Sequence, residues 1–305
     1  MRPADTASDD DLMSVALAAA RAAAALHVET TGTLPPSRWG EKDPSDFVTE
    51  VDEEAERLIV AAILEQFPTH RVLAEEGTGS AAGDREPGVL WIIDPLDGTT
   101  NWLHGYPEYA VSIAALDRRG LRVGVVINSA RGEEFVGVRG AGATLNGKPI
   151  RVSAVSELRL GLIGTGFPFK KTELIPGYLP VLGTVLERTS GVRRGGAAAL
   201  DLCHLACGRL DAFWEHWLMP WDVAAGALIV AEAGGTFGSL PVAEGHPLAG
   251  PARGGAETAA VFFEGRAQGM GAGSPVGFEP RPGAFMAGNG LVDDAFEELL
   301  RTLLG

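Results

Sequence analysis

The sequence predicts an α/β fold made of an N-terminal α+β part, residues 1–151, and a C-terminal α/β part, residues 152–305. In the first half, two helical patterns come before a series of short apolar runs, which is typical of helices packed against an antiparallel sheet. In the second half, short apolar runs alternate with helical patterns, which is typical of an α/β arrangement. A length of 305 residues exceeds the usual size of one domain, so we expect one elaborate domain or two closely packed ones.

Two helices are expected at the start of the chain. Ser8 is a helix cap, the three aspartates after it favour the positive end of a helix dipole, and apolar residues then repeat at helical spacing to about Leu26. A second amphipathic pattern follows Thr49 and ends at Pro68. Residues 30–46 between them are polar and rich in Gly and Pro, which predicts a loop or an irregular hairpin.

Short apolar runs bounded by turn residues predict the strands. In the first half they cover residues 71–75, 89–93, 109–116, 121–127 and 134–138, and residues 144–148 continue the meander with a tight turn at Asn146-Gly147. In the second half they cover residues 160–164, 191–194, 210–214, 259–263 and 284–287, and helical patterns cover residues 197–206, 221–233 and 292–303. The stretch from Leu240 to Pro282 is dense in Gly, Pro and Ala, so we expect an elaborated surface excursion there.

The composition is that of a soluble globular protein. Hydrophobic residues make up 46% of the chain and charged residues 21%, which excludes general disorder. The net charge of −15 argues against a nucleic-acid-binding or membrane-binding surface, and it implies metal cations if the substrate is an anion. The apolar stretch Leu12–Leu26 follows acids and contains Arg21, so it predicts neither a signal peptide nor a membrane span. We therefore expect a cytoplasmic protein, and its two cysteines cannot build a disulfide framework.

The segment from Trp91 to Trp102, W-I-I-D-P-L-D-G-T-T-N-W, carries the sharpest chemical signal. A buried strand ends at Asp94, a proline interrupts it and Asp97 follows, so both carboxylates and the Leu96 carbonyl can meet at one point. Two carboxylates about 4 Å apart repel by about 4 kcal/mol at an effective dielectric constant of 20, and a divalent cation such as Mg²⁺ removes that cost. Gly98 and the two threonines predict a helix start where a phosphate can lie. An isolated D-x-x-D would instead be read as a strand end with an Asx turn.

Other acidic positions are weak signals on their own. Glu75 and Glu76 end a predicted buried strand, and paired glutamates usually belong to a solvated loop. Asp52 and Asp222 each lie in the first turn of a predicted helix, where an acid interacts favourably with the helix dipole without any chemical role.

Together, these positions resemble the motifs of the inositol monophosphatase family of Mg²⁺-dependent phosphatases. The matching blocks follow the family order: Asp46-Phe-Val-Thr-Glu-Val-Asp52, Ala74-Glu75-Glu76-Gly77, Trp91 to Trp102, and Trp221-Asp222-Val-Ala-Ala-Gly226 leading into Ala231-Glu-Ala-Gly-Gly235. The third block is highly specific, and the ordered set spans most of the chain. The resemblance implies a layered αβαβα sandwich of the inositol monophosphatase and fructose-bisphosphatase type, with the metal site between its two parts.

The resemblance also implies a metal-binding or catalytic role for each matching residue. The implied ligands are carboxylates and one carbonyl: Glu75, Asp94 and the Leu96 carbonyl for a first Mg²⁺, and Asp94, Asp97 and Asp222 for a second, with Glu75 also reaching a weaker third site. Thr99, hydrogen-bonded to Asp52, would position the attacking water together with Glu75.

On the substrate side, the resemblance implies that the backbone of Gly98 and Thr99 cradles the phosphate. Glu215 matches the family acid that binds a polyol hydroxyl; read alone, it is a surface acid at a strand end. Lys42 matches the basic residue before the first aspartate motif; read alone, it is an ordinary loop lysine. Ala197 stands where the family often has a hydroxylated residue, so a hydroxyl expected near the substrate is absent.

The resemblance thus implies a lithium-sensitive homodimer that hydrolyses a small phosphate monoester with metal-activated water. Inositol monophosphate is the leading substrate, and fructose 1,6-bisphosphate, histidinol phosphate and adenosine 3′,5′-bisphosphate are alternatives from the wider superfamily. A regulatory, protein-binding member of the fold is an alternative of another class. Missing metal ligands would favour that alternative, and here none of the matching ligands is missing.

Overall fold

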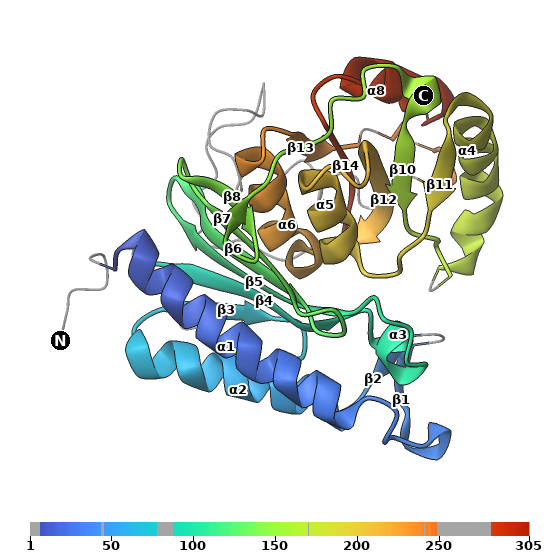
Figure 1. The fold of residues 1–305 in the computed structure, drawn as a ribbon. Helices are drawn as coiled ribbons and strands as arrows, with labels where there is room; N and C mark the ends of the chain where they lie inside the picture. Colours follow the sequence, from blue (N-terminus) through green and yellow to red (C-terminus); the bar gives the residue numbers. More distant parts are fainter. Residues whose placement is uncertain are drawn as a thin grey trace.

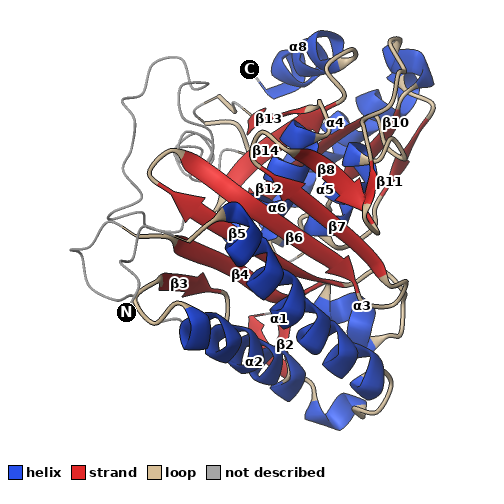
Figure 2. Cartoon of the chain, turned by 60° about the vertical axis from the view of Figure 1, so that its left-hand side comes forward, coloured by secondary structure: helices blue, strands red, loops and turns tan. Residues whose placement is uncertain are grey.

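The chain folds into five alternating layers of helix and sheet (Figures 1 and 2). The computed structural model describes residues 7–43, 46–77, 88–169, 171–240, 242–243, 245–248 and 282–304. From one outer face to the other, the layers are α1 (Asp9–Thr30) with α2 (Glu50–Gln66), a seven-stranded sheet, α5 (Ala198–Ala206) with α6 (Pro220–Glu232), a five-stranded sheet, and α4 (Ile175–Arg188) with α8 (Asp293–Leu304). The α/β expectation and the αβαβα layering are confirmed.

The seven-stranded sheet is built entirely from the first half of the chain. Its strands follow one another in chain order: β3 (Arg71–Ala74), β4 (Leu90–Asp97), β5 (Ala110–Asp117), β6 (Gly120–Asn128), β7 (Glu133–Val138), β8 (Gly142–Leu145) and β9 (Lys148–Pro149). All neighbours pair antiparallel except β3 and β4, which are parallel. The expectation of a purely antiparallel sheet is therefore wrong at this edge, where residues 75–89 are long enough for the crossover that parallel pairing requires.

The five-stranded sheet comes from the second half of the chain. In sheet order its strands are β11 (Gly191–Arg193), β10 (Leu162–Thr165), β12 (Ala212–Leu218), β14 (Gly283–Gly288) and β13 (Thr236–Ser239). The first three are parallel to one another, and β14 is antiparallel to both of its neighbours. The carboxyl ends of β10, β11 and β12 therefore meet at one edge of the sheet.

One helix and one strand of the second half differ from the sequence-based expectation. Helix α4 was not predicted because two prolines and two glycines interrupt its apolar pattern; Pro176 lies in the first turn, which tolerates proline, and Pro180 lies inside the helix. Strand β13 was not predicted because it is short and lies beside the Gly-rich stretch that was expected to be an excursion. The strand predicted at 259–263 lies outside the described residues.

Smaller elements complete the fold around the first half. Strands β1 (Gly40–Asp43) and β2 (Asp46–Val48) pair antiparallel with a register shift, which confirms the irregular hairpin.

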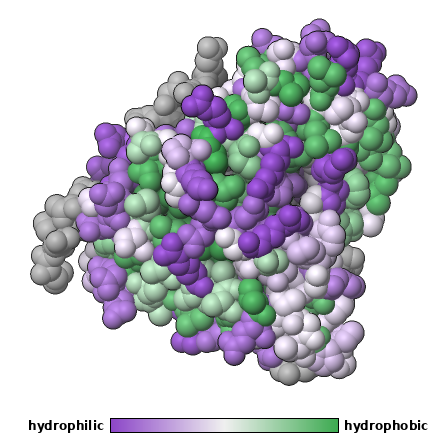
Figure 3. Space-filling view, in the orientation of Figure 1, coloured by the Kyte–Doolittle hydropathy of each residue, from purple (hydrophilic) through white to green (hydrophobic). Residues whose placement is uncertain are grey.

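Helix α1 is long and apolar enough to cross a membrane by length and composition alone. Its residues Leu12, Ala16 and Ala23 are fully buried in the core shared with α2 and the sheet, so its apolar character belongs to the protein interior. In contrast, α4 leaves Leu179 and Leu186 exposed. Hydrophobic residues gather at the right-hand edge of the molecule, where α4 lies in the same orientation (Figures 1 and 3).

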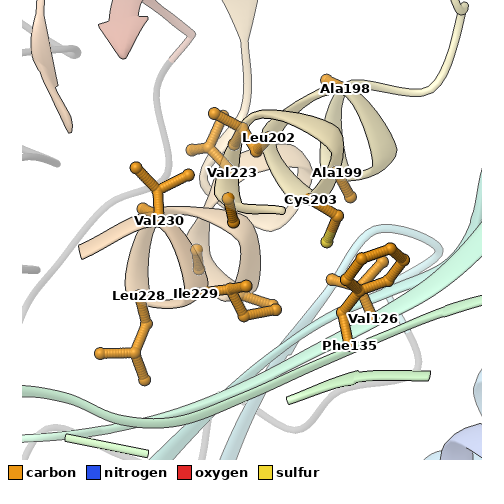
Figure 4. Packing of buried hydrophobic residues seen from close by; sticks show 14 of the residues in the cluster. Val126, Phe135, Ala198, Ala199, Leu202, Cys203, Val223, Leu228, Ile229 and Val230 are labelled. Carbon is orange, nitrogen blue, oxygen red and sulfur yellow. The ribbon is translucent and has the colours of Figure 1, made fainter. Parts of the chain in front are cut away.

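The central core lies between the two sheets, where α5 and α6 pack against β6 and β7 (Figure 4). Two glycines let the α6 backbone lie directly on the sheet. A Cβ atom added to Gly124 would lie 2.7 Å from the carbonyl oxygen of Ala225, and one added to Gly137 would lie 3.0 Å from the Cα of Ile229. This close contact fixes the position of α6, and hence of its first turn, relative to the strands of the first half.

We predict that Gly124→Ala destabilises the protein by about 1–3 kcal/mol, because the added methyl group overpacks a helix–sheet contact made by backbone atoms. Gly183→Ala is the matched control, since Gly183 is exposed on α4 and a Cβ atom added there would meet no atom within 4 Å. The control should be neutral or stabilising by up to about 1 kcal/mol. Denaturant midpoints measure both effects, and equal stability of Gly124→Ala and the natural protein would contradict the packing described here.

Candidate active site

The site begins where β4 leaves its sheet. All residues of β4 are buried, and its pairing with β5 shifts register between Asp94 and Asp97. Within this irregular stretch, the Leu96 N–H donates to Oδ1 of Asp94 at 3.0 Å. The bulge therefore turns the two carboxylates and the Leu96 carbonyl away from regular strand pairing, as the Asp-Pro-Leu-Asp sequence led us to expect.

Gly98 makes the turn that follows. Its φ is +90°, in the left-handed region that favours glycine, and it begins the short helix α3 (Thr99–Leu103). A Cβ atom there would lie 2.9 Å from the Glu108 carbonyl oxygen and 3.3 Å from the Cβ of Ala197. Only glycine suits both the left-handed backbone and the lack of space for a Cβ atom. The backbone of Gly98 and Thr99 therefore lines the pocket with no side chain at Gly98 in the way.

The predicted metal ligands line one pocket of about 160 Å³, to which both halves of the chain contribute. They are Glu75, Asp94, Leu96, Asp97 and Asp222. Burial raises the pKa of Asp94 well above its usual range, and the negative charges of Glu75, Asp97 and Asp222 raise it further. The structure thus brings together four carboxylates whose mutual repulsion a cation would relieve.

Backbone donors anchor the carboxylates and their supporting strands. Oδ2 of Asp97 accepts a 2.8 Å hydrogen bond from the N–H of Ala199, in the first turn of α5, where the helix dipole favours a negative charge. Oδ2 of Asp222 accepts a 2.6 Å hydrogen bond from the N–H of Met219, at the start of α6. The Glu75 N–H donates to the Ile93 carbonyl at 3.3 Å, which fixes the chain after β3 beside β4.

The carboxylates and the carbonyl fit Mg²⁺ by their chemistry. The donor set is all oxygen and has no His or Cys, which suits a hard divalent cation. Within the described ranges, no three His, Cys, Asp or Glu side chains already form a ready-made metal site. The fit is therefore one of donor type and of charge, concentrated in a single pocket.

Thr99 and Asp52 form the pair that was expected from the family motifs. The Thr99 hydroxyl donates to Oδ1 of Asp52 at 3.0 Å and also lies 3.1 Å from the Leu96 carbonyl oxygen. Oδ2 of Asp52 accepts from the N–H and hydroxyl of Thr49, at 2.8 and 2.5 Å. Burial raises the pKa of Asp52 to about 6, while the Thr49 and Thr99 hydroxyls oppose that shift. With its proton directed to Asp52, the Thr99 oxygen is able to accept a hydrogen bond from the pocket side.

The predicted substrate-side residues are placed differently from one another. Glu215, on β12, lines the pocket. Ala197 is buried and begins α5 without a side-chain cap, and the next residue, Ala198, lines the pocket instead. Lys42 lies on β1, and its side chain is outside the described part of the chain.

Several pocket residues were not singled out from the sequence. They form a basic and aromatic group: Phe167, Phe169, Lys171, Arg194, His216 and Trp217. The available signal was the run Phe167-Pro-Phe-Lys-Lys171 after β10 and the Arg193-Arg194 pair at the end of β11. Because β10 and β11 are parallel neighbours, these runs meet at the same edge of the sheet, which is where α/β folds place ligands.

Comparison with known proteins agrees with this architecture. The model of the inositol monophosphatase family matches residues 8–268. The protein named Nus factor SuhB from Pseudomonas aeruginosa is 45% identical over 246 residues, which are 78% of this chain and 91% of the relative. Its Escherichia coli counterpart is 39% identical over 239 residues, covering 78% and 89% of the two chains.

Solved structures extend the similarity over almost the whole chain. The extragenic suppressor protein suhB from Bartonella henselae has a TM-score of 0.78 and 34% identity, covering 95% of this chain and 98% of that chain. The inositol monophosphatase from Anabaena (Nostoc) has a TM-score of 0.74 and 32% identity, covering 96% of both. On the extent of the family match and the identity of these relatives, the chain belongs to the inositol monophosphatase family.

Proposed function

We propose that this protein hydrolyses a small phosphate monoester in the presence of Mg²⁺, with inositol monophosphate as the leading substrate. The observation that carries the proposal is the meeting of four carboxylates, the Leu96 carbonyl and the Thr99–Asp52 pair in one pocket. Family membership supports the reaction class and the metal dependence. The number of ions, two or three, is a prediction that rests on the resemblance.

Glu75, Asp94 and the Leu96 carbonyl would hold one ion, and Asp94, Asp97 and Asp222 would hold another. Bound Mg²⁺ would supply positive charge that acidifies a water molecule and stabilises the charge that develops on the phosphoryl group.

The protein's own groups would orient the reactants. Thr99 donates a hydrogen bond to Asp52, so its oxygen is able to accept a hydrogen bond from the attacking water, and Glu75 offers a second acceptor in the same pocket. The backbone N–H groups of Gly98 and Thr99 would donate to the phosphate. Four carboxylates of the described pocket are assigned to the metals and the Thr99 hydroxyl is hydrogen-bonded to Asp52, so these groups support direct attack by water rather than a phospho-enzyme.

A second candidate function is regulatory and protein-binding, because the relatives of highest identity cited above are named Nus factors. All the predicted metal ligands are present in this chain, so a regulatory role would accompany the chemistry rather than replace it. That name also favours a partner associated with nucleic acid, whereas the net charge led us to expect none. Complementation in a host that lacks its own copy decides between the roles: a turnover-deficient variant that restores growth fully would favour regulation.

The cytoplasmic location, the homodimer and the lithium sensitivity stay predictions.

We predict strict dependence on Mg²⁺, because the carboxylates repel one another and the phosphate unless a cation neutralises them. Phosphate release should fall to background in excess EDTA and return when Mg²⁺ is added. Undiminished turnover by protein whose metal content has been verified as negligible would contradict the proposal.

We predict that Asp97→Asn and Glu75→Gln each lower turnover by at least about 100-fold, on the scale of losing a positioned catalytic group. Both variants should fold, since each removes one of several repelling charges, and the amide introduced by Asp97→Asn retains an oxygen for the Ala199 N–H. The control is Glu54→Gln, which neutralises an exposed glutamate paired with Arg57 on α2 and should leave turnover unchanged. Near-normal kcat in both site variants would refute the proposed ligand set.

We predict that Glu215→Gln weakens the use of a polyol phosphate by about 1–3 kcal/mol in kcat/KM, the cost of a hydrogen bond to a charged group. An aryl phosphate has no hydroxyl to offer, so its hydrolysis should change far less. The measurement is kcat/KM for both substrates in the natural protein and the variant. An equal loss on both would show that Glu215 supports the metal ligands or the fold instead of binding the alcohol.

A further inference from the structure

One wall of the pocket is basic and aromatic, and the proposed reaction does not use it. Arg194 follows β11, Lys171 follows β10, and His216 and Trp217 lie on β12. All four line the same pocket as the carboxylates. Hydrolysis of an uncharged alcohol's phosphate needs the metals, the Gly98 turn and an acceptor such as Glu215. It has no evident need for two further cationic side chains on the substrate side.

This wall carries several buried polar atoms that have no hydrogen-bond partner in the described structure. They are Nε of Arg194, Nε1 of Trp217 and both ring nitrogens of His216. Buried polar groups are nearly always paired in folded proteins, so a cluster of exceptions in a pocket points to a ligand that completes them. Arg and Trp nitrogens can only donate. The ligand that fits them is therefore rich in acceptor atoms.

The wall is also held in place before any ligand arrives. The Arg194 guanidinium lies 5.8 Å from the ring centre of Phe167 and 5.0 Å from that of Phe169. Its Nη1 atom packs where a side chain at Gly196 would be, 2.3 Å from the position of a Cβ. Lys171 Nζ lies 5.9 Å from the Trp217 ring, and Trp217 has a φ of +65°, a left-handed conformation that bulky residues rarely adopt. Backbone strain of this kind concentrates at ligand sites.

We infer that this wall binds a second anionic group of the substrate, a phosphate or a carboxylate attached to the same alcohol as the phosphate that is hydrolysed. The inference rests on the proposed phosphatase function. The guanidinium fork matches the two oxygens of such a group, Lys171 adds a second positive charge, and Trp217 and His216 can add neutral donors. Burial lowers the pKa of His216 to about 4, so its ring is neutral near pH 7.

Two carboxylates, Glu215 and Asp201, bear on where a second anion can bind. Burial raises the pKa of Asp201 well above its usual range; the charge of Glu215 raises it further and that of Arg194 lowers it. Glu215 also lies against the backbone at Gly166, beside the Phe167 loop. Glu215 is thus suited to the hydroxyl of the substrate and Arg194 to its second anion, so the two side chains divide the leaving group between them.

The first test compares substrates that differ only in the second anionic group. Inositol 1,4-bisphosphate against inositol 1-phosphate tests a second phosphate, and 3-phosphoglycerate against glycerol 3-phosphate tests a carboxylate. We expect kcat/KM to be at least about 10-fold higher for the doubly anionic member of one pair, and that ratio to fall by about 10- to 100-fold in Arg194→Gln. Arg194→Lys keeps the charge without the fork and should retain part of the preference. The control is Arg193→Gln, an exposed neighbour outside the pocket, which should keep the full preference.

Equal kcat/KM within both pairs in the natural protein would overturn the inference. An equal loss on both members of a pair in Arg194→Gln would overturn it as well, because Arg194 would then act on the scissile phosphate or on the fold.

A binding measurement separates this inference from the proposed function. Titration calorimetry in the Asp97→Asn background, in Mg²⁺, should show at least about 10-fold tighter binding of the doubly anionic compound, and Arg194→Gln should remove the difference. If the natural protein hydrolyses none of the four compounds, the proposed function fails for these substrates. Calorimetry then still decides whether the wall binds a second anionic group. Equal affinities for both members of each pair would refute that role.

Discussion

Electrostatic repulsion among four converging carboxylates is the constraint around which the rest of this structure is arranged. Asp94 is almost completely buried, and burial and its acidic neighbours act in the same direction to disfavour its charged form. Side chains of this kind separate when the chain allows it. Here the fold holds them together through the bulge in β4, the N–H of Ala199 on Asp97 and the N–H of Met219 on Asp222. The free energy for this arrangement comes from the packing of the surrounding layers.

The layers explain how residues far apart in sequence reach one pocket. Helix α6 lies on β6 and β7 with no side chain between them at Gly124 and Gly137, so its first turn brings Asp222 to the pocket at the end of β4. Helix α5 packs beside α6, and its first turn faces Asp97. Both helices belong to the central core, so a change in their packing against the seven-stranded sheet would displace Asp222, the one proposed ligand from the second half of the chain, and the Ala199 N–H that bonds Asp97. Stability and chemistry are coupled through this one layer.

The parts of the site that were predictable from the sequence are those encoded by contiguous residues. The segment from Asp94 to Thr99 contains its own strand end, bulge, turn and helix start, so its geometry follows from local rules. Asp52 and Asp222 follow ordinary helix-start preferences, and only the ordered set of family motifs identified them. The basic wall had no such signal, because it is assembled from three short segments that become neighbours only when β10, β11 and β12 align in parallel. Helix α4 was missed for a local reason: its prolines and glycines conceal a helix that packing against α8 and the sheet stabilises.

The pocket therefore has two walls of opposite character, and each of them departs from the usual rules of protein interiors in its own way. One wall gathers negative charges that repel one another, and the other gathers buried donors without an acceptor in the described structure. Departures from local consistency are expected where function requires them, and here they are complementary. On the proposed function, a cation would relieve the repulsion in the first wall, an anion would pair with the donors of the second, and a phosphorylated alcohol would bind between them. The specificity of such a pocket depends on the part of the substrate that the metals would not bind, so on the proposed function the second wall would select the substrate and the acidic wall would supply the chemistry.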